Sequence, residues 1–471
     1  MTKTITPSFQ INTAKYNQKR SKKSHETLPI KKQDSVEFSN KPKKSKAKKL
    51  LIAFATAIGA AAIVSGVVAL TQKGKTKNIP KEDDFVDVIK TTANKIQSNA
   101  KNIQESAQNI QKTAQGIQDS AKNIQDAAQN IQKSAQELQE KANTIQTSTQ
   151  KTIEEALNSL KNVEPSEDGT KVAEKFAEDG KTLIKRASQN GEFLTIDDFI
   201  EKTRIEAKNG KLNSFSTGVE FSKNNIKKVQ EHFHFENGKL SDVFKGIENF
   251  DDDSQKMQEC FHFREEKLFE FDKGYKSPNG KLWEAEEIYA FEDRELCKFI
   301  KDFRSLDETS YRAEESFNFE DGKLIGLDKG FQIQKNNTYM IKESFNFDDG
   351  KLYEFNQGYE KYPNFSYRAQ GRYYFKDDEI RSYQKALEKC ADNTYQAQEC
   401  LFFKNGELFE FNKGYKSLDG ELWTTEEAFG FKDKKLSTWL KFKSDEDECI
   451  PDRIMNFDSD GNLLKDNKET K

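Results

Sequence analysis

The feature that most constrains this 471-residue chain is a repeat of 28 residues, which runs through its C-terminal half without insertion or deletion. Two apolar series show it most clearly. The first is Phe235, Phe263, Phe291, Phe319, Phe347, Phe375, Phe403 and Phe431. The second lies five residues after the Phe position and extends one copy further toward the N-terminus: Leu212, Leu240, Leu268, Leu296, Leu324, Leu352, Ile380, Leu408 and Leu436. This periodicity predicts nine stacked units over residues 201–464, with a partial unit from Phe457 to Leu464 as a C-terminal cap.

Each unit has the pattern of two antiparallel strands joined by a tight turn. Asn-Gly and Asp-Gly pairs between alternating segments, as at Asn237-Gly238 and Asp349-Gly350, are strong hairpin signals. A glycine followed by an aromatic residue, as in Gly274-Tyr275, indicates a bend or bulge in the returning strand. The array is therefore predicted to be a β-meander, and an open sheet, a barrel and a propeller all fit the pattern.

Several copies share a longer pattern, as in Phe345-Asn-Phe347-Asp-Asp-Gly350-Lys-Leu352. An aromatic-x-aromatic pair is followed by a turn with Gly-Lys-Leu, and then by a strand that ends in Gly-aromatic. Residues 201–464 thereby resemble MORN-type two-stranded β-hairpin repeats, in a 28-residue variant without Gly-x-Gly strand pairs. The resemblance implies an elongated β-sheet that serves as a binding or scaffolding surface.

A heptad pattern occupies the segment before the repeats. Ile89 begins a series that places an apolar residue at every seventh position as far as Ile145, and an Ala follows four residues after each of them except the last, from Ala93 to Ala142. This 4-3 spacing without Pro predicts one long helix over residues 85–161, and its narrow Ile/Ala stripe predicts a self-associating coiled coil. The alternative, an amphipathic helix on a membrane surface, fits less well because the charge is balanced.

The N-terminal part combines a basic segment with an apolar one. Leu50 to Leu70 carries no charge and, as a helix of about 32 Å, matches the roughly 30 Å bilayer core, so a transmembrane helix is predicted at 50–71. A cleaved signal peptide is the alternative. Residues 1–49 are Lys-rich and are predicted to be a disordered basic tail near anionic lipid. The Lys excess before the span predicts a cytoplasmic N-terminus and an extracytoplasmic C-terminal domain.

Three histidines and one cysteine are the candidate metal ligands in the repeats. His232 and His234 alternate onto one strand face, and His262 and Cys260 hold the same repeat phases one copy later. Those phases hold Ser and Asn in other copies, and neighbouring repeats would stand about 10 Å apart, too far for shared ligation. The five cysteines show no CxxC spacing and predict neither a zinc site nor a disulfide framework. No metal ligands are therefore predicted.

Other patterns that resemble functional motifs have simpler interpretations. Asn456, Asp458, Asp460 and Gly461 imitate the start of a calcium loop, but position 12 counted from Asn456 is Asn467, where a Glu is required, so a hairpin turn is predicted. Glutamates that recur from Glu231 to Glu427 predict a polar ladder rather than a catalytic pair of unlike carboxyls. No phosphate-binding Gly loop, HExxH or GxSxG motif occurs, and neither catalytic residues nor a cofactor are predicted.

Taken together, the patterns predict a multi-domain chain: a tail (1–49), a transmembrane helix (50–71), a coiled coil (85–161), a linker with a short helix (162–200), an all-β repeat domain (201–464) and a tail (465–471). The expected function is that of a non-enzymatic binding or scaffold protein, anchored in the cell membrane by a single span. Its repeat domain, with 44 Lys/Arg against 56 acids over residues 201–471, disfavours nucleic acid. A secreted or surface-exposed effector or adhesin, and a structural envelope tether, are the alternatives.

Overall fold

The computed structural model describes residues 82–222, 225–250, 254–278, 282–307, 309–377, 379–392, 394–417, 423–442 and 451–468. They fall into two compact units. Unit one comprises Met1–Ser120, Ile325–Lys329 and Asn336–Lys471, and unit two comprises Ala121–Leu324 and Gly330–Lys335. Each unit is described by itself below.

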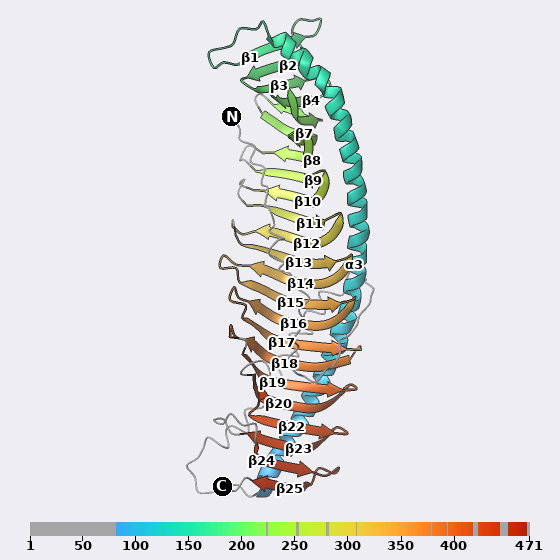
Figure 1. Cartoon of the computed structure of the whole chain (residues 1–471), viewed down its shortest axis with the longest axis vertical. Coiled ribbons are helices and arrows are strands. Elements are labelled where there is room, and N and C mark those ends of the chain that lie inside the picture. The colour runs from blue at the N-terminus through green and yellow to red at the C-terminus, as the bar shows by residue number, and fades with distance from the viewer. Residues whose placement is uncertain are drawn as a thin grey trace. The chain divides into compact units, whose positions relative to one another are not determined.

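One helix and a series of strands make up the described residues (Figure 1). Helix α3, Glu82–Leu160, contributes its first half to unit one and its second half to unit two. The strands of unit two are β1 (Lys171–Phe176), β2 (Leu183–Asn190), β3 (Phe193–Asp198), β4 (Thr203–Lys208), β5 (Lys211–Thr217), β6 (Glu220–Ser222), β7 (Asn225–Glu236), β8 (Lys239–Asn249), β9 (Gln255–Arg264), β10 (Lys267–Ser277), β11 (Glu284–Glu292), β12 (Glu295–Ser305) and β13 (Tyr311–Glu320). Strand β14 (Lys323–Ile333) contributes residues to both units.

Unit one holds the remaining strands. They are β15 (Tyr339–Asp348), β16 (Lys351–Lys361), β17 (Tyr367–Lys376), β18 (Glu379–Lys389), β19 (Tyr395–Lys404), β20 (Glu407–Ser417), β21 (Trp423–Thr424), β22 (Glu427–Lys432), β23 (Lys435–Phe442), β24 (Pro451–Phe457) and β25 (Leu463–Lys468). Strands pair antiparallel in chain order, as β7 with β8 and β15 with β16, apart from the short β6 and β21. The predicted β-meander of hairpins is therefore confirmed. In neither unit does a pairing between described strands join its first strand to its last.

The hairpin turns have the conformation expected from their sequences. Both central residues lie at positive φ, as in Asn237 (52°) and Gly238 (77°), which matches a turn whose twist suits antiparallel strands. In two unit-two turns the second position is not a glycine, and Glu266 and Arg294 adopt the same left-handed conformation at 64° and 73°. Turn geometry is thus constant while turn composition varies.

The predicted coiled coil is wrong, because the apolar stripe of α3 packs on the sheet of its own chain. The stripe residues Ile110, Ala114 and Ile153 are almost fully inaccessible to solvent. Because α3 is the one helix among the described residues, the sheet and not a second helix buries them. Near its start, the ring of Phe85 contacts that of Trp439 edge-on at 5.6 Å. A sheet face of Phe and Leu side chains offers the same complementary apolar surface that a partner helix would, and it is supplied in the same molecule.

Polar contacts set the register of the helix against the hairpins. In unit two, Gln146 Nε2 donates to the carbonyl of Gly238 at 2.8 Å, and the next three glutamines toward the N-terminus do the same to later turns. Their pairs are Gln139 with Glu266, Gln132 with Arg294 and Gln125 with Gly322. In unit one, Gln118 donates to the carbonyl of Gly350, and Gln104 Nε2 lies beside Gly406. Seven helix residues therefore correspond to one 28-residue repeat.

Two further predictions about the chain are corrected. The short helix predicted in the linker 162–200 is absent from these described residues, because β1, β2 and β3 begin the meander there. No helix in the part of the chain that the structure describes is long and apolar enough to cross a membrane. For that part of the chain, the finding contradicts the predicted single-pass topology with an extracytoplasmic repeat domain. The segment 50–71 that suggested it, and the basic tail 1–49, lie outside the described residues.

Candidate functional site

The two faces of the sheet differ in how much they change between repeats. On the helix face, all eight Phe residues of the repeated series, from Phe235 to Phe431, are buried. In β7, Lys141 of α3 lies over the ring of Phe233 and pairs with Glu231, so His232 and His234, which alternate with these residues, belong to the opposite face. The opposite face is therefore where repeats are free to differ.

A β-bulge near the turn adds one extra residue to this opposite face. In the β9–β10 hairpin, Leu268 pairs with Phe263 and Glu270 with His262, so that Phe269 is an extra residue beside His262. The rings of His262 and Phe269 are 6.1 Å apart. We call the residue before the repeated Phe, together with the bulge residue, the variable strip. Its pairs are His234/Ser241, His262/Phe269 and Ala290/Cys297 in unit two, and Asn346/Tyr353, Tyr374/Arg381, Phe402/Phe409 and Gly430/Ser437 in unit one.

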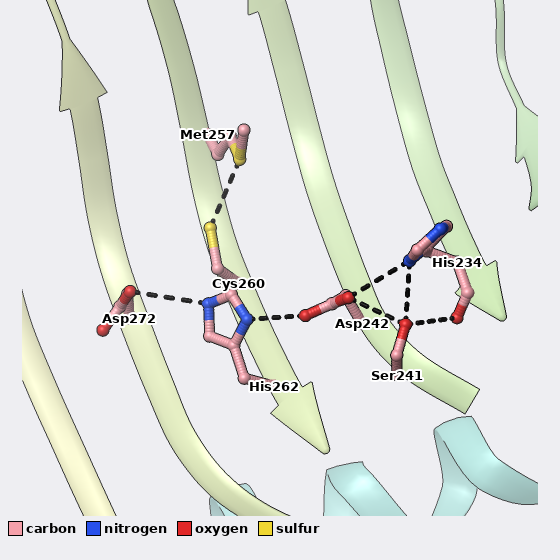
Figure 2. Close-up of polar contacts among 7 residues, drawn as sticks. All are labelled: His234, Ser241, Asp242, Met257, Cys260, His262 and Asp272. Carbon is pink, nitrogen blue, oxygen red and sulfur yellow. Dashed lines mark hydrogen bonds and ion pairs between the residues drawn. The ribbon is translucent and has the colours of Figure 1, made fainter. Parts of the chain in front are cut away.

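Polar side chains converge at one end of the unit-two strip (Figure 2). Asp242 on β8, His262 on β9 and Asp272 on β10 stand side by side across three paired strands. His262 Nδ1 is 2.8 Å from Asp242 Oδ1, and its Nε2 is 3.7 Å from Asp272 Oδ2. The Ser241 hydroxyl donates to Asp242 Oδ2 at 2.8 Å, and His234 Nδ1 is 3.3 Å from the same oxygen. We call Asp242, His262, Glu270 and Asp272 the His262 cluster.

Burial, hydrogen bonds and neighbouring charges shift the pKa values of three groups in the His262 cluster. Burial opposes a charged His262, but hydrogen bonding to Asp242 and Asp272 and their negative charges outweigh it and raise the pKa of His262 to about 10. Burial, together with the charge of Asp272, raises the pKa of Glu270 to about 8. Although burial favours its neutral form, the hydrogen bonds from His234 and His262 lower the pKa of Asp242.

The predicted histidine and cysteine positions separate in the structure. His232 Nδ1 is 2.8 Å from Ser216 Oγ, and burial lowers the pKa of His232 to about 4. Cys260 is buried, its thiol donates to Met257 Sδ at 3.4 Å, and burial raises its pKa well above the usual range. Among the described residues, His262 is the one that forms a group of three ligand-type side chains, together with Glu270 and Asp272. Sequence reasoning missed these two because it considered distances between repeats and not the short distance between paired strands.

The remaining motif-like residues have structural roles. The repeated glutamates pair with lysines of the adjacent strand, as Glu259 with Lys245 at 3.0 Å and Glu287 with Lys273 at 3.2 Å. The same glutamate–lysine ion pair thus recurs from one repeat to the next, as the predicted polar ladder requires. Asp458 Oδ1 accepts backbone N–H groups of Asp460 and Asn462, which closes the turn between β24 and β25. That segment is the predicted hairpin turn.

In unit one the same face carries a different buried polar group. Arg372 Nη2 contacts Glu354 at 2.6 Å, and its guanidinium carbon lies 4.5 Å from the centre of the Tyr374 ring. Asn356 Nδ2 donates to Glu354 as well, at 2.6 Å. On this face, different hairpins therefore carry side chains of different chemistry, although their backbone pairing is the same.

Comparisons with known proteins identify no family. No protein-family model matches the chain, and no curated protein matches it. Among solved structures, it is similar to one titled "Crystal structure of Kluyvelomyces marxianus Hsv2", with 11% identity, 46% of this chain and 98% of that chain covered, and a TM-score of 0.14. A score this low carries no argument about fold or function. The resemblance to MORN-type repeats remains a prediction.

Proposed function

We propose that this chain is a non-enzymatic binding or scaffold protein that recognises its ligand with the variable strip. The observation that carries the proposal is the contrast between the faces: the helix face repeats the same buried aromatics, whereas the strip changes from His and Phe to Ala, Asn, Tyr and Arg. Packing against the helix requires the constant aromatic residues, but it does not require the residues of the strip to vary. Variation on a constant frame is the arrangement by which repeat proteins build specific surfaces.

An exposed aromatic side chain in the strip supports the proposal. Phe409 is 36% exposed although it belongs to a regular hairpin, and its partner Phe402 lies 6.4 Å from it between ring centres. Exposed aromatic side chains are costly to leave in water and are enriched in binding surfaces. Two adjacent repeats stand about 9.6 Å apart, at two strands of about 4.8 Å each. The strip therefore suits an extended ligand, such as a peptide or a glycan chain, contacted at regular intervals.

Arrays of glycans and peptides, probed with the labelled full-length chain, test this proposal. We expect a defined set of ligands, and we expect Tyr353→Ser combined with Phe409→Ser to weaken binding by at least tenfold. Phe365→Ser is the matched control, because Phe365 is 66% exposed but lies in the turn between β16 and β17, away from the strip. Equal loss in both variants, or none in the strip variant, would refute the proposal.

A further inference from the structure

The geometry points to a binding site for a divalent transition-metal cation at His262, Glu270 and Asp272, within the β9–β10 hairpin of unit two. Each of the three offers one ligand atom, and these atoms all lie within 4.8 Å of one another. Ligand atoms around a tetrahedral zinc ion, with bonds of about 2.1 Å, stand about 3.4 Å apart. The three groups need only a small inward movement to meet this requirement.

An unpartnered buried oxygen gives independent support. Asp272 is 3% exposed, and its Oδ1 has no hydrogen-bond partner among the described residues. A buried carboxylate oxygen without a partner costs several kcal/mol of desolvation in general terms, and native structures almost always provide a donor or a cation for it. Because Oδ2 of the same carboxylate faces His262, Oδ1 is the atom left for an added ligand.

A second carboxylate orients the histidine for metal binding. Asp242 Oδ1 holds Nδ1 of His262 at 2.8 Å, which leaves Nε2 directed toward Asp272. Asp242 itself is held by the Ser241 hydroxyl and by His234 (Figure 2). Metal-ligating histidines commonly donate their other ring nitrogen to a carboxylate in this way, which sets the ring orientation and the tautomer. Asp242 is thus a positioning residue and not a ligand.

Charge at the cluster favours a cation. Three carboxyl groups, Asp242, Glu270 and Asp272, surround one imidazole. Arg264 is the basic neighbour whose charge acts on Glu270, but its guanidinium lies over the Phe269 ring, 4.6 Å from the ring centre. A divalent ion that takes the place of the proton on Nε2 of His262 would compensate the negative charge of the buried carboxyl groups.

The ligand set selects the kind of cation. One imidazole nitrogen with two carboxylates suits zinc and its first-row neighbours, whereas calcium takes six to eight oxygen ligands and magnesium keeps most of its waters. Three protein ligands leave one position of a tetrahedral ion open. The inference does not depend on the proposed function of the variable strip, because it concerns ligation within one hairpin.

Isothermal titration of the metal-free full-length chain with Zn²⁺ tests the site, and Co²⁺ absorption reports its coordination. We expect saturable binding that Asp272→Asn and His262→Gln each weaken at least 100-fold. Asp328→Asn is the matched control: Asp328 has the same repeat phase as Asp272 but accepts a hydrogen bond from Ser344 at 2.7 Å, and we expect unchanged binding. Asp242→Asn should weaken binding 10- to 100-fold.

The result that overturns the inference is absence of saturable binding at 1 mM Zn²⁺, or binding by Asp272→Asn with the affinity of the unaltered chain. Asp272→Asn is nearly isosteric, so circular dichroism is expected to show an intact sheet. A second readout is the melting temperature, which Zn²⁺ should raise for the unaltered chain and for Asp328→Asn but not for Asp272→Asn.

Discussion

Gln146 on α3 donates from Nε2 to the backbone carbonyl of Gly238, 92 residues later in the chain, at 2.8 Å. The glutamine seven residues earlier, Gln139, donates to the carbonyl of Glu266, 28 residues after Gly238. Seven helix residues rise about 10.5 Å, and one hairpin advances about 9.6 Å. Because the two steps nearly agree, each heptad meets one repeat, and the side chain after each Ile reaches a turn carbonyl.

This register predicts how deletions in unit one behave. Removing the repeat 367–394 alone leaves the helix one heptad too long and separates Phe85 from Trp439. Removing residues 108–114 as well restores that contact. We expect the paired deletion to melt close to the unaltered chain and the single deletion to melt lower, as measured by tryptophan fluorescence.

A deletion of five helix residues, 108–112, is the contrasting case. At about 100° per residue it rotates the apolar stripe by about 140° on one side of the cut and so turns it away from the sheet, and a much larger loss of stability is expected than from either deletion above. Equal melting temperatures for the five-residue and seven-residue helix deletions would contradict the heptad-to-repeat register.

The buried aromatic series predicts a large effect at Phe347. Phe347 is 3% exposed, and Phe347→Ala should lower the free energy of unfolding by about 3–5 kcal/mol because a large cavity remains. Asn346 lies on the opposite face, and its Nδ2 donates to Glu354 at 3.3 Å. Asn346→Ala should cost less than about 1 kcal/mol. Urea denaturation of both variants measures this, and a Phe347→Ala curve like that of the parent would refute the core assignment.

The turn at Glu266 predicts a stabilising substitution. Glu266 has a φ of 64°, a conformation that costs a residue with a side chain about 1–2 kcal/mol. Glu266→Gly should therefore stabilise the chain by about 0.5–1 kcal/mol after the greater flexibility of glycine in the unfolded state is subtracted. Chemical denaturation is the measurement.

Gly322 supplies the reverse experiment. It has a φ of 68°, and an added Cβ would meet nothing within 4 Å, so Gly322→Ala tests backbone conformation alone. It should destabilise the chain by about 1 kcal/mol. If both substitutions shift stability in the same direction, backbone strain is not the cause.

His232 predicts a dependence of stability on pH. Burial lowers its pKa to about 4, against about 6.5 in the unfolded chain; the negative charges of Glu206 and Asp242 oppose this shift and the charge of His234 adds to it. Below pH 6.5 the unfolded state takes up a proton at this residue that the folded state does not, so the contribution of His232 to stability decreases as the pH falls to about 4. Between pH 7 and pH 5 this contribution should decrease by about 2 kcal/mol, while His262 and Glu270, whose pKa values are raised, act in the opposite direction.

The variant His232→Asn isolates this contribution, because the other titrating groups are common to both proteins. Urea denaturation at pH 7 and pH 5 should show a smaller loss for His232→Asn than for the unaltered chain. Equal losses would show that His232 does not titrate as its burial implies.

The amino-acid sequence by itself determined the local structure of this protein. Tight-turn pairs such as Asn237-Gly238 and aromatics in alternation dictate hairpins, and Ile89 to Ile145 with their alanines dictate one long helix, because both patterns depend on contacts a few residues away. Only the tertiary structure decided what the helix stripe packs against. A narrow apolar stripe is buried equally well by a second helix or by a Phe-lined sheet, so its pattern names no partner. The meeting of His262 with Glu270 and Asp272 likewise depends on strand register and a bulge, since one residue of shift would send these side chains to the other face.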